Sequence, residues 1–195
     1  MNIRLLTSLL TITLLLSSCN LFNVIPTVDL NVSIVDGLDP GTVTVTQILI
    51  EVSGDAADPQ FAVPPLRLKA YGQPGSIAGN ITGYSIDYFY ATGDKINTST
   101  GESFRGTLAM NIPAGISCAA TSPCTINAPD VSYTKTEDVY SDPFRPIEAD
   151  IVRDLFFGTN PIEGAYASIS IEGKDANGNF FSNFLSPVTI VFTAG

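Results

Sequence analysis

The chain contains no histidine and no tryptophan, and its basic residues are few. Of 195 residues only 9 are Lys or Arg, against 19 Asp or Glu, so the formal net charge is −10. Such a charge repels a phosphate backbone and argues against a nucleic-acid partner. Without histidine the chain lacks the commonest general base, the histidine-based catalytic triads and most zinc and copper sites. We therefore expect a protein that is not an enzyme and that carries no cofactor.

Long apolar runs are also lacking, with one partial exception at the N-terminus. Arg4 gives this region a positive charge, and the apolar stretch that follows, Leu5 to Leu16, has 12 residues. A helix needs about 20 apolar residues to cross a bilayer. The stretch therefore predicts a processed signal peptide at 1–18 and not a permanent membrane span.

The apolar stretch runs directly into Leu16-Ser17-Ser18-Cys19. This segment resembles the lipobox of bacterial lipoproteins, in which a leucine and two small residues precede the cysteine that becomes lipidated. The resemblance implies cleavage between Ser18 and Cys19 and acyl groups on Cys19, which would attach the protein to a membrane. The alternative is an ordinary secretory signal in which Cys19 is incidental. Asn20 is not the Asp that retains some lipoproteins in the inner membrane, so the expected location is the bacterial cell envelope, with the outer membrane or cell surface favoured.

Two further cysteines remain, Cys118 and Cys124. They are close in the sequence and are separated by a turn-forming stretch, so we expect them to form a disulfide in an oxidising envelope. A redox-active pair is the alternative, but such sites usually have C-x-x-C spacing beside a helix.

From residue 28 onward, apolar residues alternate with polar ones far more often than they recur at helical spacing. Asn177-Gly178 is a strong hairpin signal within this pattern. About eight or nine short strands, long loop insertions and at most one short helix predict an all-β fold, an antiparallel β-sandwich. We expect one such domain at 28–195, preceded by the lipidated cysteine and a tether at 19–27.

The closing segment, Ala165 to Phe192, contains the hairpin Gly173-Lys174-Asp175-Ala176-Asn177-Gly178-Asn179. This segment resembles the last strands of bacterial immunoglobulin-like or fibronectin type III-like domains. The resemblance covers about thirty residues and implies an immunoglobulin-like sandwich.

Two segments call for a separate interpretation. Residues 54–65 contain three prolines, which cannot donate to a strand ladder, and we expect a loop there. Residues 146–157 begin with Pro146 at a suitable first helical position, and Ile147, Ile151 and Leu155 recur at four-residue steps. The same residues also alternate as a strand would, and we favour the short helix.

One candidate metal site lies in the hairpin. Asp175, Asn177 and Asn179 follow the D-x-N-x-N spacing that opens an EF-hand calcium loop. However, Phe180 stands where the loop needs glycine and Ser186 where it needs glutamate. A hairpin turn accounts for the same residues, so we predict no metal and retain the three as a calcium candidate only.

Tyr84, Tyr88 and Tyr90 share one strand face and are the candidate ligand-binding residues, as a sugar-stacking platform if that face is exposed. Carboxylates that a carbohydrate-active enzyme would need are most frequent between Glu137 and Asp154. The alternatives are an ordinary core strand and a solvated acidic surface.

Two classes of function remain. The first is a lipid-anchored, non-enzymatic adhesion, scaffold or assembly module, whose partner is an envelope protein or polysaccharide. The second is a carbohydrate-binding or carbohydrate-active surface lipoprotein that uses tyrosines and carboxylates. The scarcity of catalytic residue types favours the first.

Overall fold

The computed structural model describes residues 27–38, 43–55, 57–97, 103–119, 130–157 and 164–194. Within these ranges the chain forms thirteen strands and one helix. In chain order these are β1 (Leu30–Asp36), β2 (Gln47–Asp55), β3 (Asp58–Ala62), β4 (Leu66–Gly72), β5 (Gly79–Tyr90), β6 (Lys95–Ile96), β7 (Phe104–Ile112), β8 (Ile116–Cys118), β9 (Val131–Tyr133), β10 (Val139–Tyr140), α2 (Ala149–Phe157), β11 (Ala165–Asp175), β12 (Phe180–Phe184) and β13 (Val188–Ala194).

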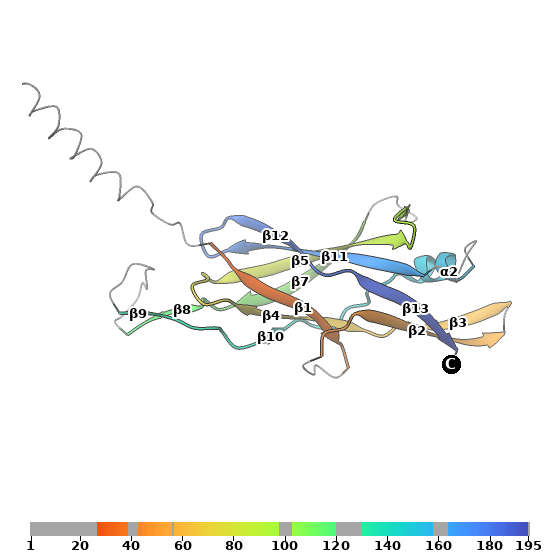
Figure 1. The fold of residues 1–195 in the computed structure, drawn as a ribbon, viewed down its shortest axis with the longest axis horizontal. Helices are drawn as coiled ribbons and strands as arrows, with labels where there is room; N and C mark the ends of the chain where they lie inside the picture. The colour runs from red at the N-terminus through yellow and green to blue at the C-terminus, as the bar shows by residue number, and fades with distance from the viewer. Residues whose placement is uncertain are drawn as a thin grey trace, which may run out of the picture.

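The strands form a small sheet and a large sheet. The small sheet has the order β1-β4-β10, and the large sheet has the order β3-β2-β13-β11-β5-β6, with β12 beside β11 and β7 beside β5. The strands extend along the molecule, with the β8–β9 hairpin at one end and α2 at the other (Figure 1). Buried residues of both sheets, including Leu68 of β4 and Ile169 of β11, belong to one hydrophobic cluster. The predicted all-β sandwich is confirmed.

The strand order within each sheet resembles that of an immunoglobulin-type sandwich. In such folds the first, second and fifth strands lie in one sheet, and the third, sixth and seventh lie in the other. Here β1, β4 and β10 form the first group, and β5, β11 and β13 form the second. The remaining strands of the large sheet, β2, β3, β6, β7 and β12, extend the second group, and β8 and β9 form a separate hairpin.

The sandwich has more strands than the eight or nine expected, and not all of them are antiparallel. β2 and β13 pair in parallel, from Gln47 opposite Thr189 to Val52 opposite Ala194. Alternation in a sequence indicates which face of a strand is buried, but it does not indicate the direction of the neighbouring strand. The additional strands are mostly two or three residues long, too short to show a period.

The loop predicted at 54–65 is wrong for much of its length. β2 continues to Asp55, and β3 pairs back on it with Pro59 opposite Gly54. β3 lies at the edge of the large sheet. An edge strand tolerates proline because one side of its backbone has no partner, so the missing N–H breaks no ladder.

The centre of the fold is the antiparallel pair β5–β11, which runs from Tyr90 opposite Ala165 to Gly79 opposite Asp175, with a one-residue shift of register between Glu172 and Gly173. Ile86 lies opposite Ile169, and both are fully buried. On the other side of β5, Gly106 of β7 lies opposite Tyr84. A Cβ atom at Gly106 would lie 2.3 Å from the Tyr84 ring, so this position requires glycine.

The predicted helix is confirmed as α2, which buries Ile151, Val152 and Leu155. It begins later than Pro146, because the first helical hydrogen bond runs from the Val152 N–H to the Glu148 carbonyl, at 3.0 Å. The Pro146 carbonyl instead accepts a hydrogen bond from the Tyr88 hydroxyl at 2.9 Å. In the part of the chain that the structure describes, no helix is long and apolar enough to cross a membrane.

Replacing Tyr88 with phenylalanine tests this link between the core and the start of α2. Tyr88 is fully buried, so Tyr88→Phe leaves a buried carbonyl without its donor. We expect the free energy of unfolding to fall by about 1–3 kcal/mol in urea denaturation. The control is Tyr90→Phe, on the same strand but 40% exposed, which should change the free energy of unfolding by less than about 0.5 kcal/mol. Equal effects of the two substitutions would contradict the assignment.

Candidate functional site

The structure separates the three tyrosines predicted as a ligand platform. Tyr84 and Tyr88 are 6% and 0% exposed and lie in the core, whereas Tyr90 is 40% exposed. The Tyr84 ring packs against Phe144, with ring centroids 4.6 Å apart. Burial raises the pKa of both Tyr84 and Tyr88 above the ordinary tyrosine value. The face that the three residues define is the inside of the sandwich, so they form no exposed platform.

The calcium candidate Asp175, Asn177 and Asn179 belongs to the turn between β11 and β12. Oδ1 of Asp175 accepts hydrogen bonds from the N–H groups of Asn177 and Asn179, each at 2.8 Å. Oδ2 accepts a third from the Asn179 side-chain amide at 2.9 Å. That side-chain bond, followed by the backbone ones, lowers the pKa of Asp175. Both carboxylate oxygens are engaged in closing the hairpin, which is the structural role that the sequence also indicated.

The described ranges also contain no other group of side chains that could form a metal site. Nowhere among these residues do three or more His, Cys, Asp or Glu side chains gather where they could hold a metal ion.

Of the three cysteines, the structure describes one. Cys118 is the last residue of β8 and lies opposite Val131 of β9. Cys19 and Cys124 lie outside the described residues, so the lipidation and the disulfide stay predictions.

The carboxylates between Glu137 and Asp154 have separate structural roles. Asp138 pairs with two lysines. Oδ1 of Asp150 accepts a hydrogen bond from the Ile151 N–H at 2.9 Å, in the first turn of α2. Asp154 lies farther along the helix and lines a surface hollow with Tyr90. The pairing of Asp138 with lysines is the one feature of this stretch that builds a charged cluster.

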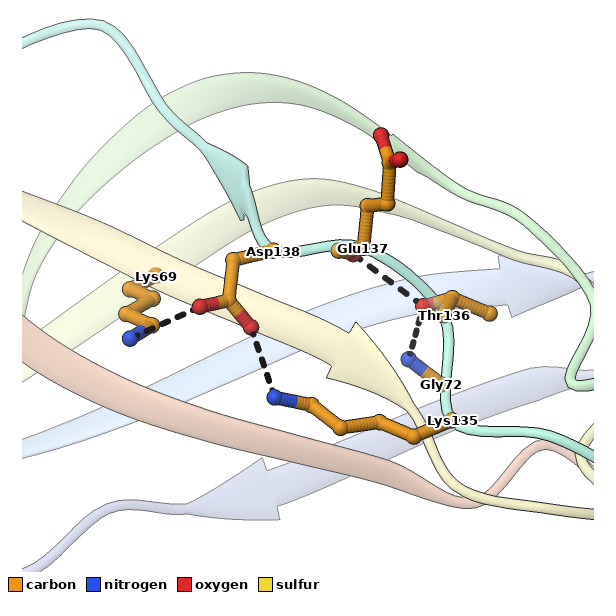
Figure 2. Close-up of polar contacts among 6 residues, drawn as sticks. All are labelled: Lys69, Gly72, Lys135, Thr136, Glu137 and Asp138. Atoms are coloured by element: carbon orange, nitrogen blue, oxygen red, sulfur yellow. Dashed lines mark hydrogen bonds and ion pairs between the residues drawn. The ribbon is translucent and has the colours of Figure 1, made fainter.

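This cluster, which the sequence did not reveal, joins β4 to the segment before β10 (Figure 2). Asp138 lies between two ammonium groups: Nζ of Lys69 is 2.9 Å from its Oδ2, and Nζ of Lys135 is 3.0 Å from its Oδ1. The Lys69 side chain is only 15% exposed and that of Asp138 is 27% exposed. The same Lys135 ammonium lies 3.8 Å from the centroid of the Tyr71 ring, a cation–π contact. We call Lys69, Tyr71, Lys135 and Asp138 the clamp.

The charges of the clamp stabilise one another. The hydrogen bond to Asp138 raises the pKa of Lys69. In turn, the hydrogen bonds from Lys69 and then Lys135 lower the pKa of Asp138. Lys69 and Asp138 therefore each stay ionised over a wider pH range than they would alone.

Backbone contacts beside the clamp hold the same segment. The Thr136 hydroxyl accepts a hydrogen bond from the Gly72 N–H at 2.8 Å and donates one to the Glu137 carbonyl at 3.2 Å (Figure 2). The Thr136 N–H donates to the Gly72 carbonyl at 3.1 Å. Lys69 and Asp138 are 69 positions apart, and only the fold brings them together. The clamp attaches the irregular segment 134–138 to the small sheet.

A second charged group lies on the outer face of the large sheet. Asp87 of β5 pairs with Lys95 of β6 and accepts a hydrogen bond from the Ser103 hydroxyl. Burial opposes ionisation of Asp87, but the bonds from Lys95 and Ser103 outweigh it and lower its pKa. This group fixes the short strand β6 against β5.

The exposed Tyr90 takes part in a surface hollow of about 470 Å³. The hollow combines aromatic, amide and charged groups, and its lining is Tyr90, Lys95, Ile96, Asn97, Asp154 and Phe157. Tyr90 is thus the one tyrosine of the predicted platform that a ligand could reach.

Comparison with known proteins identifies no family. No protein-family model matches the chain, and no curated protein matches it. One similar solved structure is the X-ray structure of Northeast Structural Genomics Consortium target SoR45. It is 9% identical, with 85% of this chain and 86% of that chain covered and a TM-score of 0.35. A likeness at this level carries no argument about function.

Loss of the Asp138 charge from the clamp should lower the stability of the protein only within a defined pH range. Asp138→Asn removes the negative charge between two ammonium groups, so we expect the Tm to fall by about 2–4 °C at pH 7. The folded-state pKa of Asp138 is lowered below its ordinary value of 3.8, so its contribution is present above that pH. The contribution is lost as the pH falls through the lower folded-state value.

Calorimetry of wild type and variant between pH 2.5 and 8 measures this difference. The gap in Tm should be constant from pH 5 to 8, should close in acid, and should shrink in 1 M salt because the pairs are partly exposed. Asp142→Asn, at an exposed neighbouring carboxylate, is the control. A gap that persists unchanged at pH 2.5 would show that charge is not the cause.

Proposed function

We propose that the chain is a lipid-anchored, extracytoplasmic β-sandwich protein that acts as a non-enzymatic adhesion, scaffold or assembly module of the bacterial cell envelope. The observation that carries the non-enzymatic part is how three of the described carboxylates are used. Asp87, Asp138 and Asp175 each bind groups of the chain itself and fix a strand, a segment or a turn. Carboxylates engaged in this way stabilise structure and are not free to act as acid and base.

The lipid anchor is supported by the lipobox-like Leu16-Ser17-Ser18-Cys19. Between Cys19 and Thr27, the first described residue, lies a short connection. Such a connection suits a domain held close to the membrane by acyl groups. The location that we propose is the outer membrane or cell surface, and the partner is an envelope protein or polysaccharide.

The carbohydrate-binding alternative has lost most of its support. It depended on an exposed platform of tyrosines, and two of the three are in the core. The remaining support for carbohydrate binding is the surface hollow that Tyr90 lines.

Substitution of Cys19 tests the anchor. We expect the native protein to fractionate with membranes, with a mass that lacks residues 1–18 and includes acyl groups. Cys19→Ala should release it, because no acylated residue remains to hold an acidic domain on an anionic surface. Ser17→Ala is the control, since it keeps a small residue before the cysteine. Native protein that is soluble and unacylated would refute the lipoprotein proposal.

We also propose the disulfide between Cys118 and Cys124. Its support is that Cys118 ends β8, that β8 pairs with β9, and that Cys124 lies in the connection between the two strands. A bridge there would close a small loop that begins at the end of β8.

Thiol counting tests this bridge. Without reductant, the denatured protein should show no thiol at these two positions to an alkylating agent, and with reductant it should show two. Cys124→Ser should lower the free energy of unfolding by about 2 kcal/mol at most, because the closed loop is short. Alkylation of Cys118 without reductant would contradict the pairing.

A further inference from the structure

Strand β12 carries two phenylalanines that are far more exposed than such side chains usually are. Phe180 is 82% exposed and Phe184 is 75% exposed. Between them in the strand, Phe181 packs against the core, so Phe180 and Phe184 point to the outer face of the large sheet. β12 pairs with β11 and with no other described strand. Exposed apolar side chains on an edge strand favour association, so natural proteins usually cover or avoid them.

The start of the described chain lies beside this strand. A Cβ atom at Gly79 would contact Val28, Leu30 and Phe181, so the three side chains surround one point. The Thr27 carbonyl accepts a hydrogen bond from the Ile77 N–H at 3.4 Å, which holds the residues just before β1 in this position. The beginning of β1 and the turn between β11 and β12 accordingly lie at the same end of the molecule (Figure 1).

The length of chain before Thr27 limits how far β12 can be from the proposed lipid. Seven residues, 20–26, lie between the lipidated Cys19 and Thr27, so the connection from one to the other is eight residue steps long. Fully extended, eight residues span at most about 29 Å. We propose that Phe180 and Phe184 dock on the bilayer to which Cys19 is anchored. This inference rests on the proposed lipid anchor.

With the lipid on Cys19 holding the protein at the membrane, a weak contact of Phe180 and Phe184 with the bilayer is enough for docking. Two phenylalanine side chains alone would bind a bilayer only marginally, as a single short acyl chain does. A short tether raises the effective concentration of the strand at the surface, so docking becomes an intramolecular step.

The charges beside β12 agree with contact at the headgroup level. Nζ of Lys174 lies 4.6 Å from the centroid of the Phe180 ring. There it can interact with lipid phosphates while the ring enters the apolar layer. Glu172 and Asp175 are also on β11, so the surface is not basic and its contact does not require anionic lipid.

The absence of tryptophan from the chain makes a direct test possible. Phe180→Trp introduces a single reporter, in the acylated full-length protein reconstituted into vesicles of phosphatidylcholine and phosphatidylethanolamine. Doxyl-labelled lipid should quench its emission by about twofold or more, and the emission should shift to shorter wavelength relative to the same substitution in the Cys19→Ala protein without vesicles.

Phe157→Trp is the matched control. Phe157 is 50% exposed and ends α2, at the opposite end of the molecule (Figure 1), so its reporter should stay in water and unquenched. Phe184→Trp is a second reporter on β12, in case Phe180→Trp does not fold, which circular dichroism checks.

The outcomes separate the two proposals. Acylated protein in which the reporters on β12 are quenched no more than the reporter at Phe157 overturns the docking alone. Protein without acyl mass on Cys19 overturns the lipid anchor, and the docking with it.

Discussion

The antiparallel pairing of β5 with β11 is the interaction on which the rest of the structure depends. Both strands contribute large buried side chains, and each pairs on its other side with further strands of the large sheet. The core that they form also receives β4 of the small sheet and the buried face of α2. Tyr88 extends this core to the start of α2 through the Pro146 carbonyl. A change in the register of this pair by one residue would turn every buried side chain of β5 toward solvent.

Two carboxylates of this acidic chain, Asp138 and Asp87, connect short segments to that core. Asp138 holds the segment before β10 to β4, and Asp87 holds β6 to β5. In both cases basic partners favour the ionised form of a partly exposed carboxylate, and the connected piece is too short to be stable by strand pairing alone. Three of the four lysines of the chain, Lys69, Lys95 and Lys135, are used in these structural pairs.

Much of the fold follows from the sequence because burial on one face of a strand leaves an alternating pattern. The pattern at 165–171 and the Asn177-Gly178 turn predict β11 and its hairpin correctly. The clamp was not predictable, because Lys69 and Asp138 are distant in sequence and each looks like an ordinary surface charge. The tyrosines show what alternation leaves open. It places Tyr84, Tyr88 and Tyr90 on one face of a strand, but it does not indicate whether that face lies inside the sandwich. Pro59 in β3 shows that a residue unfavourable in a central strand is acceptable at an edge.

From the lipobox-like sequence, the short connection to Thr27 and the exposed phenylalanines of β12, we propose a domain held directly against a membrane. Neutron reflectometry of the acylated protein on a supported bilayer tests this account most directly, since it measures where protein density begins relative to the lipid headgroups. The account predicts a protein layer that starts at the headgroups with no intervening water. A water layer between headgroups and protein, or no bound protein, would contradict it.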